Sequence, residues 1–144
     1  MKRVLIVDDS KQIRERVAAL LAGSDQIRIV GEAGDGYQAM RVIPQLKLDT
    51  IILDIRLPKK NGIEMLKEVK VLYPKIRVIM LTNYDYDLYR QQCKRLGADH
   101  FLNKTLEFEK IMASILEDSS YLKKQRSFRL MKRRKLPWKH LTIS

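Results

Sequence analysis

The chain has very little cysteine and no long hydrophobic run. Cys93 is the only cysteine among 144 residues, so an internal disulfide is excluded. Its helical spacing with Tyr89 and Leu96 indicates a small core residue and not a reactive thiol. The apolar run at the N-terminus stops at Asp8, which makes it too short for a signal peptide or a membrane span. We therefore expect a cytoplasmic protein.

Acidic residues are missing from the C-terminal end, and histidine is scarce throughout. The two histidines, His100 and His140, have no partner at metal-ligand spacing, and we assign neither a role. Residues 1–120 carry 20 basic and 17 acidic side chains, whereas residues 121–144 carry nine basic side chains and no acidic one. We therefore predict a body over residues 1–120 and a basic C-terminal extension over residues 121–144.

The body has the composition and the pattern of one α/β domain. Hydrophobic residues make up 45% and charged residues 32% of the chain, as in ordinary globular proteins. Five apolar segments alternate with segments of helical periodicity, and no internal repeat is present. Most of the apolar runs are unbroken, which is typical of parallel strands covered on both faces. The predicted strands are Val4–Val7, Ile27–Val30, Ile51–Leu53, Val78–Leu81 and His100–Leu102.

Helix signals lie between these strands. Ser10 and Asn61 are predicted N-caps, and Asp35 opens the second helix. Pro44 is expected to kink or end that helix, because proline lacks a backbone donor. We expect Leu72 to face the core from the third helix. The residues expected to face inward from the last helix are Phe108, Ile111, Met112 and Ile115.

Carboxylates follow the first and third strands at the point where each strand ends. Short connections and right-handed crossovers favour an α/β fold with a doubly wound, five-stranded parallel sheet of order 2-1-3-4-5 and helices on both faces. This order places Asp8 and Asp9 beside Asp54 in the crevice where such sheets bind ligands. Carboxylates this close require a cation, and an all-oxygen site suits Mg²⁺. The pattern predicts phosphoryl chemistry on Asp54.

Two further polar residues close the fourth and fifth strands, namely Thr82 and Lys104. Together with the carboxylates, and with Pro58 and Gly62 after the third strand, they resemble the motif of the response-regulator receiver domain of two-component signalling. The resemblance covers nearly the whole body and implies a flavodoxin-like fold. Because each of these polar residues closes a predicted strand, in the order that the motif has them, the resemblance is specific.

The resemblance assigns a role to each residue of the motif. Asp54 is implied to be the phosphoacceptor, and Thr82 and Lys104 are implied to contact the phosphoryl oxygens. Phe101 is implied to be an aromatic residue that takes part in the conformational switch. The implied ligands of Mg²⁺ are Asp8, Asp9, Asp54 and the backbone carbonyl of Arg56. Thr105 follows Lys104 where this family commonly has proline.

The resemblance further implies a single-domain response regulator. Such a protein takes its phosphoryl group from a sensor histidine kinase or a histidine phosphotransfer protein and passes the signal to a downstream protein target by changing its conformation. A homodimer through the last two helices and the last strand is also implied. The chain would promote only its own phosphorylation and dephosphorylation and would not be an enzyme acting on outside substrates.

Two other functions were weighed for the body. A phosphatase resembling the haloacid dehalogenases would carry its nucleophile after the first strand in an Asp-x-Asp pattern, whereas here that strand is followed by Asp8-Asp9-Ser10. A flavodoxin-like binder of small molecules would need a phosphate loop rich in glycine and hydroxyl groups after the first strand. Two aspartates at that place would repel a phosphate.

The basic extension leaves an alternative open. Its 24 residues are too few for a helix-turn-helix domain. Tyr121, Phe128 and Met131 lie at helical spacing, which predicts a partly helical segment that Pro137 breaks. Such a segment would present a basic, amphipathic surface to an acidic partner, a membrane or nucleic acid. The alternative is therefore a receiver fragment or regulator whose basic tail binds nucleic acid or another polyanion.

Overall fold

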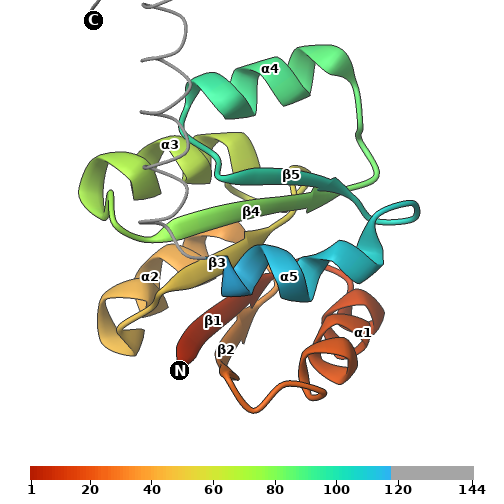
Figure 1. Cartoon of the computed structure of the whole chain (residues 1–144). Helices are drawn as coiled ribbons and strands as arrows, with labels where there is room; N and C mark the ends of the chain where they lie inside the picture. The colour runs from red at the N-terminus through yellow and green to blue at the C-terminus, as the bar shows by residue number, and fades with distance from the viewer. Residues whose placement is uncertain (118–144) are drawn as a thin grey trace, which may run out of the picture.

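The fold is one parallel sheet enclosed by helices. A computed structural model describes residues 1–117, so the predicted basic extension, 121–144, lies outside the described residues. Five strands form the sheet in the order β2-β1-β3-β4-β5, which confirms the predicted fold class (Figure 1). The strands are β1 (Lys2–Val7), β2 (Ile27–Ala33), β3 (Thr50–Leu53), β4 (Arg77–Thr82) and β5 (His100–Asn103).

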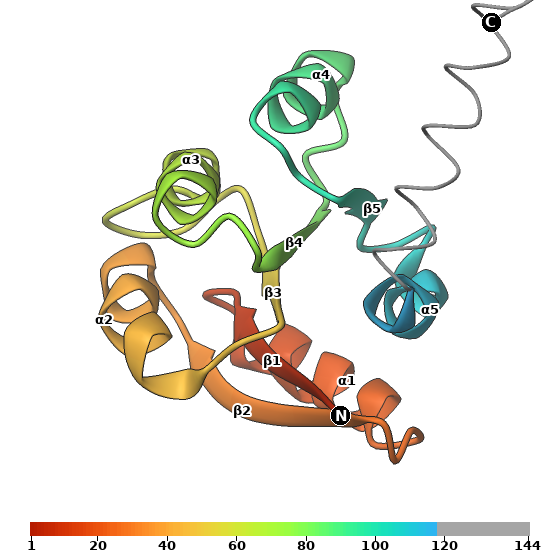
Figure 2. The same cartoon turned by 60° about the vertical axis from the view of Figure 1, so that its left-hand side comes forward.

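Helices cover both faces of the sheet. They are α1 (Lys11–Leu21), α2 (Gly36–Leu46), α3 (Gly62–Leu72), α4 (Asp87–Arg95), the 3₁₀ helix η1 (Phe108–Lys110) and α5 (Ile111–Leu116). Figure 2 shows α2, α3 and α4 on one side of the sheet and α1 and α5 on the other. The apolar core is accordingly split into two clusters, with side chains of the central strands contributing to both. This is the burial on both faces that the unbroken apolar runs predict.

The predicted N-caps form in three helices. The side chains of Ser10, Asp35 and Asn61 each accept a hydrogen bond from a backbone N–H in the first turn of α1, α2 and α3. Such bonds satisfy donors that have no partner inside the helix. Cys93 is fully buried, which confirms the expectation of a small core residue, and burial raises the pKa of its thiol to about 11.

Two expectations about α2 and α3 are changed by the structure. Of the two effects expected of Pro44, a kink or an end of the helix, the end does not occur at the proline, because α2 continues to Leu46. The expectation for Leu72 is wrong. Leu72 does not face the core and is 59% exposed. The residues that follow α3 contact the core instead of Leu72. Tyr73 packs against the core cluster, and Ile76 belongs to that cluster.

β2 is longer than predicted. It continues past Val30 to Ala33 through an irregularity in its pairing with β1, where the register shifts between Val4 and Leu5. A Cβ atom on Gly31 would lie 3.0 Å from Leu46 Cδ1 and 3.2 Å from Leu5 Cδ1. The absence of a side chain at Gly31 therefore allows α2 and β1 to pack closely against β2. A glycine within a strand also commonly marks a bulge.

Candidate functional site

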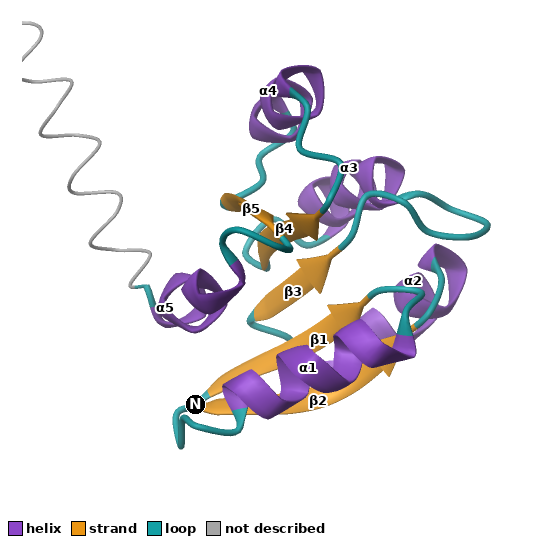
Figure 3. Ribbon diagram, turned by 90° about the vertical axis from the view of Figure 1, so that its right-hand side faces the viewer, coloured by secondary structure: helices purple, strands orange, loops and turns teal. Residues whose placement is uncertain are grey.

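The strand register brings the predicted site residues to one edge of the sheet. Val7 pairs with Leu53, so Asp8 and Asp54 are the next residues along two neighbouring strands. The backbone N–H of Asp54 donates to the carbonyl of Val7 over 3.1 Å, which extends the pairing by one residue. Figure 3 shows the arrowheads of β1, β3 and β4 pointing toward this edge. The carboxyl ends of the strands therefore carry the candidate site, as predicted.

Three carboxylates meet at this edge. Asp8 and Asp54 are buried, at 3% and 4% exposure, while Asp9 is exposed. Carboxylate oxygens of the three residues lie within 4.8 Å of one another. Oxygen donors grouped in this way, with one side open to solvent, form a set suited to a hard divalent cation. The predicted carboxylate cluster is thus present.

Lys104 reaches into the same cluster from the end of β5. Its Nζ lies 2.6 Å from Asp8 Oδ2 and 2.8 Å from Asp54 Oδ2, and its backbone N–H donates to the carbonyl of Thr82 over 3.0 Å. The side chain is almost buried, so these two carboxylates are its principal counter-charges. One ammonium is fewer positive charges than a cluster of three carboxyl groups can accommodate, and a divalent cation would supply the rest.

Burial and ion pairing act against each other in this cluster. Burial raises the pKa of Asp8, and the hydrogen bonds from Lys104 and from the backbone of Ser10 offset part of this increase. Burial disfavours the charge of Lys104, but the hydrogen bonds to Asp54 and Asp8 outweigh it and raise the pKa of the ammonium. Lys104 is therefore a fixed positive charge in the site at neutral pH.

The loop after β3 holds Asp54 in place. Its Oδ1 accepts a hydrogen bond from the N–H of Ile55 over 2.7 Å, and the N–H of Gly62 donates to the carbonyl of Ile55 over 2.7 Å. A Cβ atom on Gly62 would lie only 1.9 Å from the carbonyl oxygen of Asp54. Only glycine fits at this close approach, which gives a physical reason for a glycine eight residues after Asp54.

Thr82 is the last residue of β4, and Arg56 lies in the loop after β3. Thr82 is fully buried, and its Oγ1 accepts from the N–H of Tyr84 over 3.1 Å, which leaves the hydroxyl proton free to be donated elsewhere. Arg56 is exposed, with its guanidinium 4.3 Å from the centre of the Tyr84 ring. This cation–π contact ties the two loops together beside the carboxylates.

A charged network beyond the motif was not anticipated from the sequence. Arg90 of α4 contacts Asp85, Glu107 and the carbonyl of Phe101, and its guanidinium lies 4.7 Å from the centre of the Phe101 ring. Phe101 is partly buried and packs against the core cluster. Nothing in the local sequence around Arg90 signals these contacts, because its partners belong to different loops.

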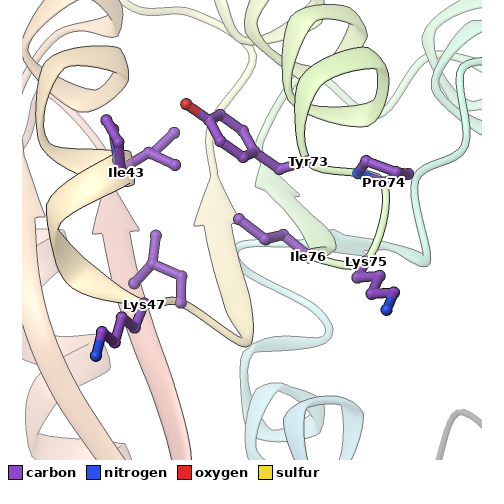
Figure 4. Close-up of a pocket in the computed structure, with 8 residues that line it drawn as sticks. Ile43, Lys47, Tyr73, Pro74, Lys75 and Ile76 are labelled. Atoms are coloured by element: carbon purple, nitrogen blue, oxygen red, sulfur yellow. The ribbon is translucent and has the colours of Figure 1, made fainter.

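An apolar pocket of about 400 Å³ lies elsewhere in the fold (Figure 4). It opens between the C-terminal ends of α2 and α3, and its lining includes Ile43, Tyr73 and Ile76. In the figure Lys47 and Lys75 point away from its apolar centre. The pocket has no carboxylate in its lining and lies at the edge where β3 and β4 begin, opposite the acidic cluster. It takes no part in the candidate site.

Comparisons with known proteins agree on one family. A protein-family model described as the response regulator receiver domain matches residues 4–116. Protein CcdB of Bacillus subtilis (strain 168) is 36% identical over 115 residues, which covers 80% of this chain and 95% of that protein. Several other curated relatives, transcriptional regulatory proteins among them, are matched over 48% to 52% of their length, so the chain spans about half of them.

Solved structures give the same result. The chain is similar to the signal receiver domain of the putative response regulator NarL from Mycobacterium tuberculosis, with a TM-score of 0.73, 31% identity, and coverage of 80% of this chain and 93% of that chain. It is also similar to the Mn²⁺-bound form of response regulator Rcp1, with a TM-score of 0.68, 26% identity and coverage of 80% and 89%. Among residues 1–117 no helix has the length and apolar character needed to cross a membrane.

Proposed function

The chain belongs to the response regulator receiver domain family, and on this premise we propose that it is a single-domain response regulator whose phosphoacceptor is Asp54. The observation that carries the assignment is the geometry around this carboxylate. Asp54 is buried at the end of β3, its Oδ2 lies 2.8 Å from Lys104 Nζ, and two further carboxylates lie beside it. A receiver domain accepts its phosphoryl group from a histidine kinase or a histidine phosphotransfer protein, which we propose as the partners.

Phosphoryl transfer requires that the reacting groups are positioned and that the negative charge of the phosphoryl oxygens is neutralised. A carboxylate oxygen of Asp54 attacks the phosphorus of a phosphohistidine donor, a P–O bond forms, and the P–N bond to the imidazole breaks. Lys104 is placed to donate to a phosphoryl oxygen, because its ammonium already lies at hydrogen-bond distance from Asp54. Thr82 has a hydroxyl proton that it can donate to a second phosphoryl oxygen.

The proposed metal is Mg²⁺, held by Asp8, Asp9, Asp54 and the backbone carbonyl of Arg56. The carboxylate cluster supports this assignment, and the Mn²⁺-bound form of Rcp1 shows a divalent cation in a similar protein. When bound there, the cation would neutralise negative charge on the carboxylates and on the phosphoryl oxygens. Mg²⁺ is favoured because it binds through a few carboxylates and keeps water ligands that phosphoryl oxygens can replace.

The proposed output of the reaction is a conformational change. Contacts of Thr82 and Lys104 with the phosphoryl group would shift the loops after β4 and β5, and Phe101 with them, toward a form that a downstream protein recognises. We propose that the chain acts in the cytoplasm without an enzymatic activity toward outside substrates. The match to nearly the full length of CcdB supports a receiver that works without an attached output domain.

Phosphorylation of Asp54 is tested by incubating the protein with acetyl phosphate and MgCl₂ and measuring its intact mass. We expect one phosphoryl group on the wild type, none without the divalent cation, and none on Asp54→Asn, because the amide is not a nucleophile. The matched control is Asp25→Asn, which removes an exposed acidic residue away from the site and should label normally. Equal labelling of Asp54→Asn and the wild type would contradict the assignment.

A further inference from the structure

Arg90 connects three separate parts of the chain through one guanidinium group. Its Nη2 donates to Asp85 Oδ2 over 3.1 Å and to Glu107 Oε1 over 3.3 Å, and its Nη1 donates to the carbonyl of Phe101 over 3.4 Å. The guanidinium also lies 4.7 Å from the centre of the Phe101 ring. Arg90 thus holds the loop after β4, the strand β5 and the loop after β5 against α4.

These contacts reach the residues that would touch the phosphoryl group. Asp85 lies in the loop after β4, three residues after Thr82, the last residue of that strand. Asn103, which directly precedes Lys104, donates its side-chain amide to Asp85 Oδ2 over 3.2 Å. The backbone N–H of Asn103 donates to Glu107 Oε1 over 3.1 Å. Figure 1 shows the loop after β4 and the loop after β5 at the same end of the sheet. Displacement of either loop would therefore disturb the contacts of Arg90.

Two carboxylates of the network share the guanidinium of Arg90. The hydrogen bond from Arg90 holds the pKa of Asp85 below its usual value. The backbone N–H of Asn103 does the same for the pKa of Glu107, with smaller contributions from Lys110 and Arg90. Both carboxylates are thus ionised at neutral pH and face one shared guanidinium. Single ion pairs at this degree of exposure are weak, but a shared planar donor fixes the relative position of both loops.

We propose that Arg90 is a latch that holds the loop after Thr82 and the loop that contains Lys104, together with Phe101, in the arrangement of the unphosphorylated protein. The inference rests on the proposed function and adds the element that opposes switching. Movement of Thr82 or Lys104 toward a phosphoryl group pulls on Asp85 or Asn103, so the latch must open as the signal forms. Two-state elements respond to such a bias by a shift in population. Removing the latch therefore favours the switched form before any phosphorylation.

Lysine cannot replace arginine at this place. An ammonium is a point charge, whereas the guanidinium presents donors in a fixed plane and stacks on an aromatic ring. The Arg90→Lys variant keeps the charge of α4 but loses the planar set of donors and the stacking on Phe101. We expect its NMR signals and its labelling rate to lie between those of the wild type and Arg90→Ala. This comparison separates the geometry of the latch from its charge.

The latch is tested with full-length wild type, Arg90→Ala and Arg90→Lys, using Lys94→Ala as the matched control. Lys94 is an exposed basic residue of the same helix, and no ion pair with it is present among residues 1–117. Amide NMR spectra are recorded with and without beryllofluoride, a mimic of the phosphoryl group. In Arg90→Ala we expect the signals of residues 82–86 and 101–107 to move, before any addition, along the line toward their positions in beryllofluoride-treated wild type.

A second measurement is the rate of labelling by acetyl phosphate. We expect Arg90→Ala to be labelled about five- to tenfold faster than the wild type, the lower end of typical coupling between two sites, and Lys94→Ala to be unchanged. A substitution that only destabilises the fold would lower the melting temperature without moving signals along that line. The latch would be overturned if the signals of Arg90→Ala stayed at their wild-type positions and its labelling rate were unchanged. Absence of any response in the wild type would instead refute the proposed function.

Discussion

Lys104 is the side chain on which the charge balance of the acidic site depends. It bridges Asp8 and Asp54 at 2.6 and 2.8 Å, so its ammonium lies against two of the three carboxylates that would hold a divalent cation. An ammonium and a dication near the same oxygens repel each other, and at low effective dielectric this repulsion is large compared with thermal energy. Binding of the metal and the position of Lys104 are therefore linked.

We predict that Lys104→Ala binds Mg²⁺ about tenfold more tightly than the wild type, because the competing positive charge is removed. The measurement is a titration with MgCl₂ followed by amide NMR shifts of residues 8, 9 and 54. Lys110→Ala, which removes an exposed lysine outside the acidic cluster, serves as the control and should bind like the wild type. An unchanged or weaker affinity in Lys104→Ala would show that the lysine does not compete with the metal.

The junction between β3 and α3 fixes the position of Asp54, the proposed phosphoacceptor. The first residue of α3, Gly62, packs against the backbone of Asp54 and donates to the carbonyl of Ile55. Asn61 caps the same helix by accepting from two backbone N–H groups. The start of α3 and the end of β3 thus form one rigid unit, and the glycine allows them to approach so closely.

We predict that Gly62→Ala lowers the free energy of unfolding by about 3 kcal/mol, because the added Cβ would lie 1.9 Å from the carbonyl oxygen of Asp54 and the backbone must shift. Urea unfolding followed by circular dichroism gives the value. The control is Gly23→Ala, whose Cβ would meet its nearest atom at an ordinary 3.5 Å. That control should change the stability by less than about 0.5 kcal/mol. Equal stabilities of the two variants would contradict the account of the junction.

The chain as a whole combines a nearly neutral body with a strongly basic end. Residues 1–120 carry 20 basic and 17 acidic side chains. Residues 121–144 carry nine basic side chains and no acidic side chain. That segment lies outside the described residues, so a role for it in binding polyanions stays a prediction from the sequence. Its charge alone favours non-specific attraction to nucleic acid.

We predict that the full chain binds duplex DNA with an affinity that falls as salt rises, and that deletion of residues 121–144 removes this binding. Each phosphate neutralised by a basic side chain contributes about 0.9 to the slope of log affinity against log salt concentration. Replacing Arg133 and Arg134 by Gln in the full chain should reduce the slope by up to about 1.8. The slope is measured by fluorescence anisotropy, and equal binding by the truncated protein would rule out the extension as the DNA contact.

The sheet, the order of its strands and the edge that carries the acidic residues could be predicted from the sequence. Strands covered on both faces must be apolar throughout, so β1, β3 and β4 were visible as unbroken runs. Each run ends where a charged or hydroxyl residue can reach solvent or a counter-charge, which placed Asp8, Asp54 and Thr82 together at one edge. Local rules also identified the caps of α1, α2 and α3, because a cap depends only on residues within one turn.

Features that depend on contacts between distant segments could not be predicted and are seen only in the folded protein. The extension of β2 past Gly31 could not be predicted, because a bulge depends on the pairing with the neighbouring strand. Leu72 has helical spacing with the core, but the chain after α3 fills the space that it was expected to occupy. Arg90 meets Glu107 across 17 residues of sequence, and no local pattern selects that pair. Contacts between loops follow from how the strands and helices pack, and their partners become neighbours only after folding.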